Sequence, residues 1–142
     1  MAKIKTLVIV SGYFNPLHKG HVEYLERSKQ LGDKLAVIIN NDLQVELKGS
    51  VKFQSEDERK LIIEALRCVD YVFISIDNGR DVSKTLQCVC TNLEADNYIF
   101  ANGGDQTATT ILESAICDEL DIKLVFGLGE KIQSSSELKK KL

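Results

Sequence analysis

The chain contains two histidines, and they stand three positions apart in the segment "SGYFNPLHKGH" (Ser11–His21). An apolar run, "TLVIV", comes directly before this segment and predicts a buried strand, whereas the residues that follow it have the spacing of a helix. Residues at positions i and i+3 share one face of a helix, so His18 and His21 can both face the point where the helix begins. Free N–H groups and the helix dipole favour an anion at that point.

Two imidazoles beside a helix N-terminus suit a phosphate group, because they can donate hydrogen bonds to oxygens whose negative charge rises during a reaction. A single histidine would be interpreted more simply as a surface or core residue, but the pair, Gly20 and the strand-to-helix position favour phosphate chemistry. Zinc is disfavoured and no metal ligand is predicted, because the segment offers no carboxylate or cysteine. Gly12 allows the backbone to approach a ligand closely, and Pro16 stiffens the loop.

Two later segments have residue types that suit a nucleotide. In "GGDQ" (Gly103–Gln106), Gly103 and Gly104 would let a flat nucleoside lie against the backbone. Asp105 could accept a hydrogen bond from a ribose hydroxyl or a base amino group, although an ordinary turn is the alternative. The hydroxyls of "SSS" (Ser134–Ser136), at an expected helix start, suit a β- or γ-phosphate, with an ordinary helix cap as the alternative.

These segments require a scaffold of alternating strands and helices. The expected strands are 6–11, 34–40, 70–76, 97–104 and 122–129, and the expected helices are 21–31, 55–69, 81–93, 107–120 and 134–142. This alternation predicts an α/β fold: a Rossmann-like, doubly wound, five-stranded parallel sheet with helices on both faces. In such a sheet, ligands bind beyond the carboxyl ends of the strands.

Two parts of this scaffold carry more detailed expectations. Helix 55–69 is expected to be capped by Ser55 and to turn five apolar side chains inward: Leu61, Ile62, Ala65, Leu66 and Val69. The polar region 40–54 is expected to be a long connection, and long connections in compact domains are often functional.

Composition limits the classes of protein that fit. With 142 residues, we expect a single domain over 1–142. The formal net charge of −3 and the scattered lysines and arginines argue against nucleic acid as a partner. No apolar run approaches the ~18 residues that a membrane span needs. Four cysteines without zinc-site spacing, and without a secretory signal, indicate reduced thiols in the cytoplasm.

Four segments, in order along the chain, resemble the cytidylyltransferase-like nucleotidyltransferases. "GYFNPLHKGH" resembles the HxGH signature of that family, and "LKGS" around Lys48 resembles its lysine-bearing loop after the second strand. "GGDQ" resembles its glycine-aspartate turn, and "KIQSSSEL" (Lys131–Leu138) resembles its terminal Ile-Ser-Ser/Thr-Ser/Thr motif. The resemblance is closest to two small types: glycerol-3-phosphate cytidylyltransferases, and the adenylyltransferase module that activates heptose phosphate in lipopolysaccharide synthesis.

The resemblance implies transfer of a nucleoside monophosphate, CMP in preference to AMP, from CTP or ATP to a small phosphorylated alcohol or sugar, with release of pyrophosphate. It implies that His18 and His21 bind the triphosphate and stabilise the pentavalent transition state, and that Lys48 binds a phosphate. No protein nucleophile is involved, so positioning and charge neutralisation would supply most of the rate. A Mg²⁺ ion would bridge the triphosphate oxygens. A homodimer is also expected.

The resemblance further implies a set of nucleotide-binding residues and two phosphate or acceptor contacts. The contacts are Arg59 and Lys131, and the nucleotide-binding set is Gly12, Tyr13, Phe14, Asn15, Gly20, Gly103, Gly104, Asp105, Gln106, Ser134, Ser135 and Ser136. Asn15 departs from the family, because many cytidylyltransferases have Asp there.

Three alternatives stay open. The chain could be a non-catalytic module that binds a nucleotide or phosphometabolite. It could be an adenylyltransferase of the nicotinate mononucleotide or pantetheine-phosphate type. It could also be one half of an enzyme whose second activity, such as a kinase, lies on a separate chain.

Overall fold

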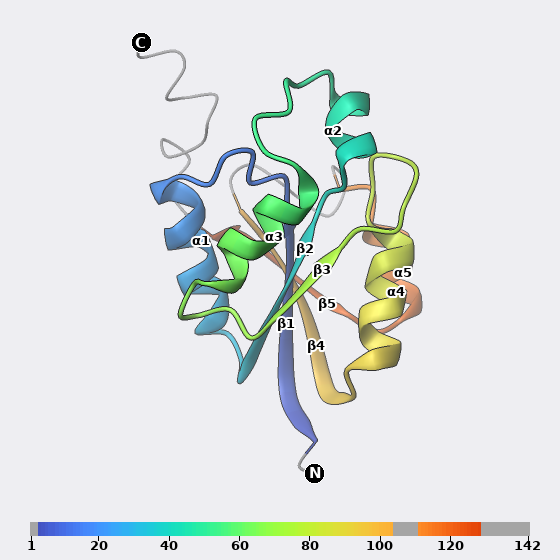
Figure 1. The fold of residues 1–142 in the computed structure, drawn as a ribbon. Helices are drawn as coiled ribbons and strands as arrows, with labels where there is room; N and C mark the ends of the chain where they lie inside the picture. The colour runs from blue at the N-terminus through green and yellow to red at the C-terminus, as the bar shows by residue number, and fades with distance from the viewer. Residues whose placement is uncertain (1–2, 104–110, 129–142) are drawn as a thin grey trace.

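The computed structural model describes residues 3–103 and 111–128. Strands and helices alternate along these ranges, with one additional helix between the second and third strands (Figure 1). The strands are β1 (Ile4–Gly12), β2 (Lys34–Ile39), β3 (Tyr71–Ile74), β4 (Ala95–Gly103) and β5 (Lys123–Leu128), and the helices are α1 (Lys19–Lys29), α2 (Asp42–Lys48), α3 (Glu56–Glu64), α4 (Ser83–Asn92) and α5 (Ser114–Glu119). All five expected strands are confirmed. None of the helices described is long and apolar enough to span a membrane.

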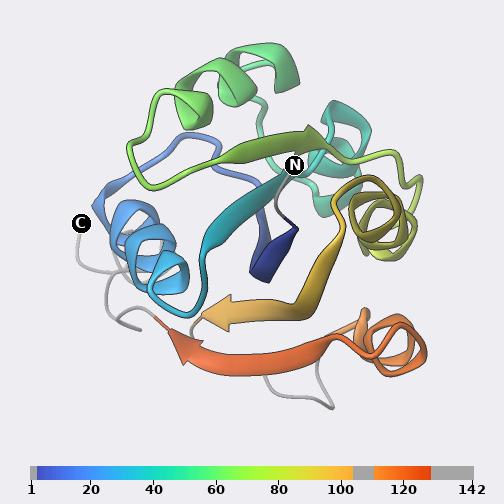
Figure 2. The same cartoon turned by 90° about the horizontal axis from the view of Figure 1, so that it is seen from below.

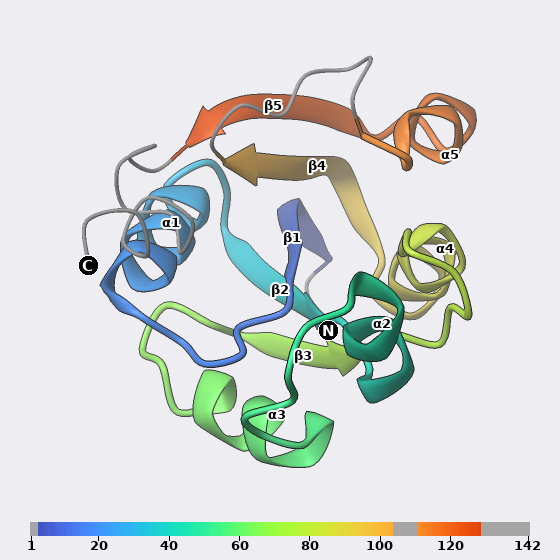
Figure 3. The same ribbon diagram turned by 90° about the horizontal axis from the view of Figure 1, so that it is seen from above.

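The five strands form one parallel sheet in the order β3-β2-β1-β4-β5. Helices α1 and α3 lie on one face of this sheet, and α4 and α5 lie on the other (Figures 2 and 3). The chain builds outward from β1 to β3, then returns to the other side of β1 to add β4 and β5. The order therefore reverses between β1 and β4, which is where ligands bind in doubly wound sheets. The predicted fold class is confirmed.

Alternate side chains of β1 supply two separate hydrophobic cores. Leu7 and Ile9 pack into the core beneath α4 and α5, and Val8 and Val10 pack into the core beneath α1 and α3. All four have zero exposure. A strand that is covered on both faces has a continuous apolar sequence, so β1 could be predicted directly from its residues.

The helix expected over 55–69 is shorter and turned differently from the expectation. Ser55 caps it as predicted, but α3 ends at Glu64. Leu61, expected inward, is 69% exposed, whereas Ile63 is fully buried. The buried stripe passes instead through Arg59, which is 1% exposed. Arg59 was expected to contact a phosphate or acceptor and was not among the residues predicted to face inward.

Arg59 holds together the connections at the carboxyl ends of the strands. Its Nη1 donates to the carbonyl oxygens of Tyr13, 2.9 Å away, and Asn40, 2.6 Å away. Its Nη2 donates to Asp42 Oδ1 at 2.9 Å, and its Nε donates to the Gln54 carbonyl at 3.2 Å. Because the side chain has zero exposure, Arg59 lies inside the protein rather than open to a ligand. This geometry disagrees with the expected contact to a phosphate or acceptor.

The region 40–54, expected to be a connection, contains helix α2. Asn41 Oδ1 accepts from Gln44 N at 2.9 Å, and Gln44 Oε1 accepts from Asn41 N at 3.0 Å. This reciprocal pair is a capping box, and Gly49, with a φ of 82°, ends the helix in the left-handed conformation. Both signals are present in the sequence. The helix was not predicted because its apolar pattern is short.

We predict that Arg59→Met lowers the free energy of unfolding by about 2–4 kcal/mol, because three backbone carbonyl groups and Asp42 lose their donor. Denaturant unfolding of the purified variants measures this change. Arg67→Met is the matched control, since Arg67 is exposed and its loss should cost about 0.5 kcal/mol or less. A loss below about 1 kcal/mol for Arg59→Met would show that the guanidinium does not hold these connections together.

Candidate active site

Two adjoining cavities open at the carboxyl ends of β1, β2 and β4. The first has a volume of about 560 Å³ and the second of about 360 Å³. Both are lined by Ser11, Gly12, Tyr13 and Tyr24, which therefore form a shared wall. This place is the point of strand reversal beside β1, where the sequence analysis expected a ligand.

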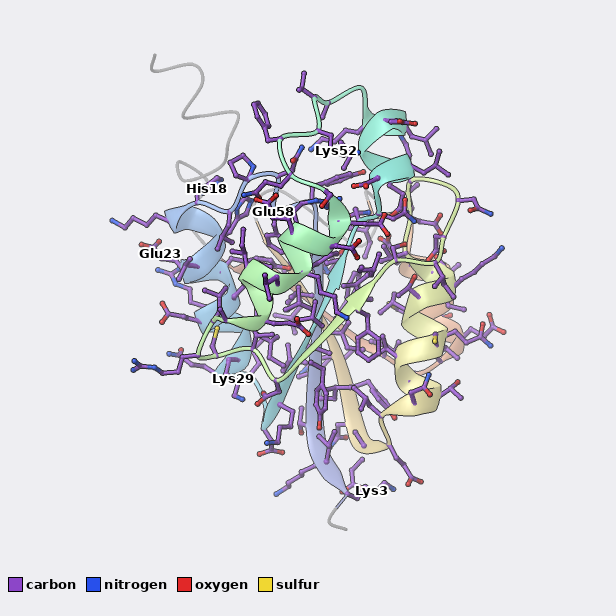
Figure 4. The ribbon with its side chains drawn as sticks, in the orientation of Figure 1. Lys3, His18, Glu23, Lys29, Lys52 and Glu58 are labelled. Atoms are coloured by element: carbon purple, nitrogen blue, oxygen red, sulfur yellow. The ribbon has the colours of Figure 1, made fainter. Side chains whose placement is uncertain are left out.

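The histidine pair begins α1 and is fixed by its own backbone. His18 is the N-cap residue, and its Nδ1 accepts from Gly20 N at 3.0 Å. His21 Nδ1 accepts from His18 N at 3.1 Å, and the two rings stack with their centroids 3.7 Å apart. Because both Nδ1 atoms accept hydrogen bonds, each neutral ring carries its proton on Nε2. The pair therefore presents two Nε2–H donors. Figure 4 labels His18 at the same end of the molecule as Lys52.

The surroundings of both imidazoles disfavour their charged form. Burial lowers the pKa of His18 below its ordinary value. Burial, with smaller effects of His18 and Lys48, lowers the pKa of His21 to about 4. Both rings are therefore neutral donors near pH 7 until a negative ligand arrives.

Lys48 belongs to the same cavity as His21. It is the last residue of α2, so the helix that the sequence analysis missed is the element that positions it. Its Nζ lies 4.3 Å from the centroid of the Tyr13 ring, which is within reach of a cation–π contact. The structure thus brings together the three residues predicted to be catalytic: the two histidines and this lysine.

Phe14 supports the histidine pair from behind. Its ring is 2% exposed and meets His21 edge-on, with 5.1 Å between the ring centroids. A Cβ atom on Gly12 would lie 2.7 Å from Phe14 Cζ, so a side chain there would displace the ring. Phe14 thus fills the space that a side chain at position 12 would need, while Gly12 itself lines both cavities.

Asn15 fastens the connection between α2 and α3 over the first cavity. Its Nδ2 donates to the Val51 carbonyl at 2.8 Å, and its Oδ1 accepts from Phe53 N at 3.0 Å and Gln54 N at 3.2 Å. An aspartate could not supply the Nδ2 donor. This contact gives a structural reason for Asn at a position where many cytidylyltransferases have Asp.

The second cavity contains residues that the sequence analysis missed. Gly103 was predicted, but Arg80, Asn102 and Glu113 were not. Glu113 Oε2 accepts from Val82 N at 2.9 Å, and burial is the main cause that raises the pKa of this carboxyl. Arg80 follows β3, so inspecting the segment after every strand would have found it.

Several predicted site residues lie outside the described residues: Gly104, Asp105, Gln106, Lys131, Ser134, Ser135 and Ser136. Within the described ranges, no three His, Cys, Asp or Glu side chains form a group that could hold a metal ion.

Comparison with known proteins places this site in a family. The model of the cytidylyltransferase-like family matches residues 9–137. The chain is 40% identical over 110 residues to the "Bifunctional protein HldE" of Syntrophotalea carbinolica, a match that covers 76% of this chain and 21% of that protein. It is 32% identical over 145 residues to HldE of Geotalea uraniireducens, which covers 93% of this chain and 28% of that protein.

A solved structure has the same fold. The lipopolysaccharide core biosynthesis protein of Thermoplasma volcanium superimposes with a TM-score of 0.69 and 25% sequence identity, covering 88% of this chain and 98% of that chain. The chain thus spans 21% to 28% of the two curated relatives' length and nearly all of the solved one. The family match includes the histidine pair, Lys48 and most of the parallel sheet, so the chain belongs to the cytidylyltransferase-like family of nucleotidyltransferases.

Proposed function

We propose that this chain transfers AMP from ATP to the phosphate of a small phosphorylated sugar and releases pyrophosphate. The observation that carries the proposal is the cavity at the carboxyl end of β1 that His21 and Lys48 line together, with the His18 ring stacked on His21. The sequence resembled both glycerol-phosphate and heptose-phosphate enzymes. The similarity to a lipopolysaccharide core biosynthesis protein supports the heptose-phosphate type, and with it AMP rather than CMP.

In the proposed reaction, an anionic phosphate oxygen of the acceptor forms a bond to the α-phosphorus of ATP. The bond from that phosphorus to the oxygen bridging to the β-phosphate breaks, and this oxygen keeps the electron pair and leaves with pyrophosphate. The attacking oxygen is already ionised near pH 7, so the chain need not remove a proton. Its residues orient the two substrates and stabilise the negative charge.

Each of the three residues has a distinct role in this proposal. His18 and His21 donate from Nε2 to oxygens of the triphosphate, and these hydrogen bonds strengthen as charge builds in the transition state. The Nδ1 contacts keep both donors in place before the substrate binds. Lys48 adds a positive charge to the same cavity.

We propose that Mg²⁺ accompanies the triphosphate. The described residues offer no cluster of carboxylates or imidazoles for it, which fits an ion held by phosphate oxygens and water. When bound, it would neutralise part of the phosphate charge.

One relative is named a bifunctional protein, and the chain spans 21% of it. A linked activity on a separate chain stays a prediction. A homodimer stays a prediction, as do the readings of the chain as a binding module or as another type of adenylyltransferase.

A test of donor and acceptor follows from this proposal. With Mg²⁺ present, we expect pyrophosphate release from ATP and heptose 1-phosphate at a rate at least tenfold above that from CTP and glycerol 3-phosphate. We also expect ATP at 100 times its dissociation constant to add about 2.7 kcal/mol of stability in a thermal-shift assay. Faster turnover with CTP and glycerol 3-phosphate would overturn the choice of substrates. No binding of any triphosphate would overturn the transferase proposal itself.

Removal of either histidine tests the proposed charge stabilisation. We predict that His18→Ala and His21→Ala each lower kcat by about two to four orders of magnitude, because each removes a donor to the transition state. Steady-state pyrophosphate release measures this, with Arg67→Met as the control. Activity within tenfold of the unmodified protein for both variants would contradict the assignment.

The depressed pKa of His21 predicts a loss of stability in acid. The unfolded imidazole titrates near 6.5, whereas the folded one titrates near 4. Between these values the unfolded chain binds more protons, so the free energy of unfolding falls as the pH falls. We expect His21→Asn to lose less stability between pH 7 and pH 5 than the unmodified protein, as measured by urea unfolding. An equal loss in both proteins would show that His21 does not titrate as described.

A further inference from the structure

The second cavity has a different chemical character from the first. Among the described residues that line it, Arg80 is the only cation and Glu113 the only carboxylate. Asn40 and Asn102 add amide groups, and apolar side chains such as Val82 complete the lining. A cavity of 360 Å³ lies at the small end of the range of roughly 300–1,000 Å³ for ligand pockets. A single sugar ring suits it better than a larger group.

The loop that carries Arg80 is held on both sides by α2. The Gln44 side chain, with zero exposure, donates from Nε2 to the carbonyl oxygens of Gly79 and Asp81, each at 2.8 Å. Its Oε1 accepts from Asn41 N and from Asn40 Nδ2. A buried side chain with all of these contacts leaves the loop little freedom. The backbone of Arg80 is therefore fixed, although its side chain is exposed.

The guanidinium itself is available to a ligand. Within 3–103 and 111–128, Arg80 makes no hydrogen bond or ion pair, and its charge acts on the Tyr13 hydroxyl in the shared wall. Glu113 Oε2 accepts a hydrogen bond from Val82 N. The other oxygen, Oε1, can accept one from a ligand. A planar cation with five donors and a carboxylate oxygen in the same cavity suit a ligand with several hydroxyl oxygens.

From this geometry, and resting on the proposed function, we infer that the second cavity holds the neutral, polyhydroxylated body of a sugar phosphate and that Arg80 selects it. Arg80 donates to the sugar oxygens and Glu113 Oε1 accepts from a sugar hydroxyl. The shared wall beside β1 brings the acceptor phosphate toward the first cavity, where the triphosphate binds. A phosphorylated alcohol that carries its own positive charge, such as phosphoethanolamine, is disfavoured because Arg80 repels it.

The main test compares Arg80→Met with Arg67→Met, an exposed arginine outside both cavities. We expect Arg80→Met to raise the KM for heptose 1-phosphate tenfold or more, and to leave the dissociation constant for ATP, measured by calorimetry, within twofold. We expect the control to change neither value. An acceptor KM that stays within twofold in Arg80→Met would overturn the inference, as would a preference of the unmodified protein for phosphoethanolamine.

The outcome remains interpretable if no pyrophosphate is released. Calorimetric titration with heptose 1-phosphate would then measure acceptor binding alone. If binding weakens at least tenfold in Arg80→Met, this result supports the second cavity as the acceptor site even though no transfer reaction is observed. No binding to the unmodified protein overturns the inference. If the protein turns over an acceptor whose KM does not change in Arg80→Met, the proposed function stands and this inference is overturned.

Gln44→Glu tests the role of Gln44 as a positioning residue. Glutamate keeps an oxygen acceptor but loses the Nε2 donor to Gly79 and Asp81. We expect a rise of about threefold to tenfold in the acceptor KM with kcat kept within twofold. A fall in melting temperature with an unchanged KM would show that Gln44 only stabilises the fold.

Discussion

The buried guanidinium of Arg59 is the contact on which the geometry of the active site depends. Parallel strands end at one edge of the sheet, and the connections that leave this edge carry backbone carbonyls that lack sheet partners. Arg59 donates to such carbonyls at Tyr13 and Asn40, and it pairs with Asp42 at the start of α2. One side chain thus fixes the segments after β1 and β2 relative to each other. Lys48 and the histidine pair stand on those segments.

Several residues near the cavities hold one another rather than facing a ligand. Phe14 backs His21, Asn15 fastens the connection above the first cavity, and the Nδ1 atoms of both histidines accept from the backbone. These contacts leave only the Nε2 atoms as ring donors. A site fixed in this way need not rearrange when charge develops on a substrate, which is the condition under which hydrogen-bond donors are most effective.

The sequence predicts the sheet better than it predicts the connections. β1 and β2 are covered on both faces, so their apolar runs identify them directly. The histidine pair could be found because its residue types are rare and its spacing matches a helix. Arg59 could not be placed, since burial of an arginine depends on carbonyl groups contributed by distant segments. Helix α2 and Arg80 are local features of the chain, but their importance follows from Gln44, which joins them across 35 positions.

The two cavities share a wall, and this arrangement fits the demands of the proposed reaction. Displacement at phosphorus requires the attacking and leaving oxygens to lie roughly in line, on opposite sides of the reacting atom. Two substrates in one open cavity could approach from many directions. Substrates that enter separate cavities and meet at Ser11–Tyr13 have fewer possible approaches. Because α2 carries Lys48 and, through Gln44, holds the loop of Arg80, one short helix sets the positions of a cation in each cavity.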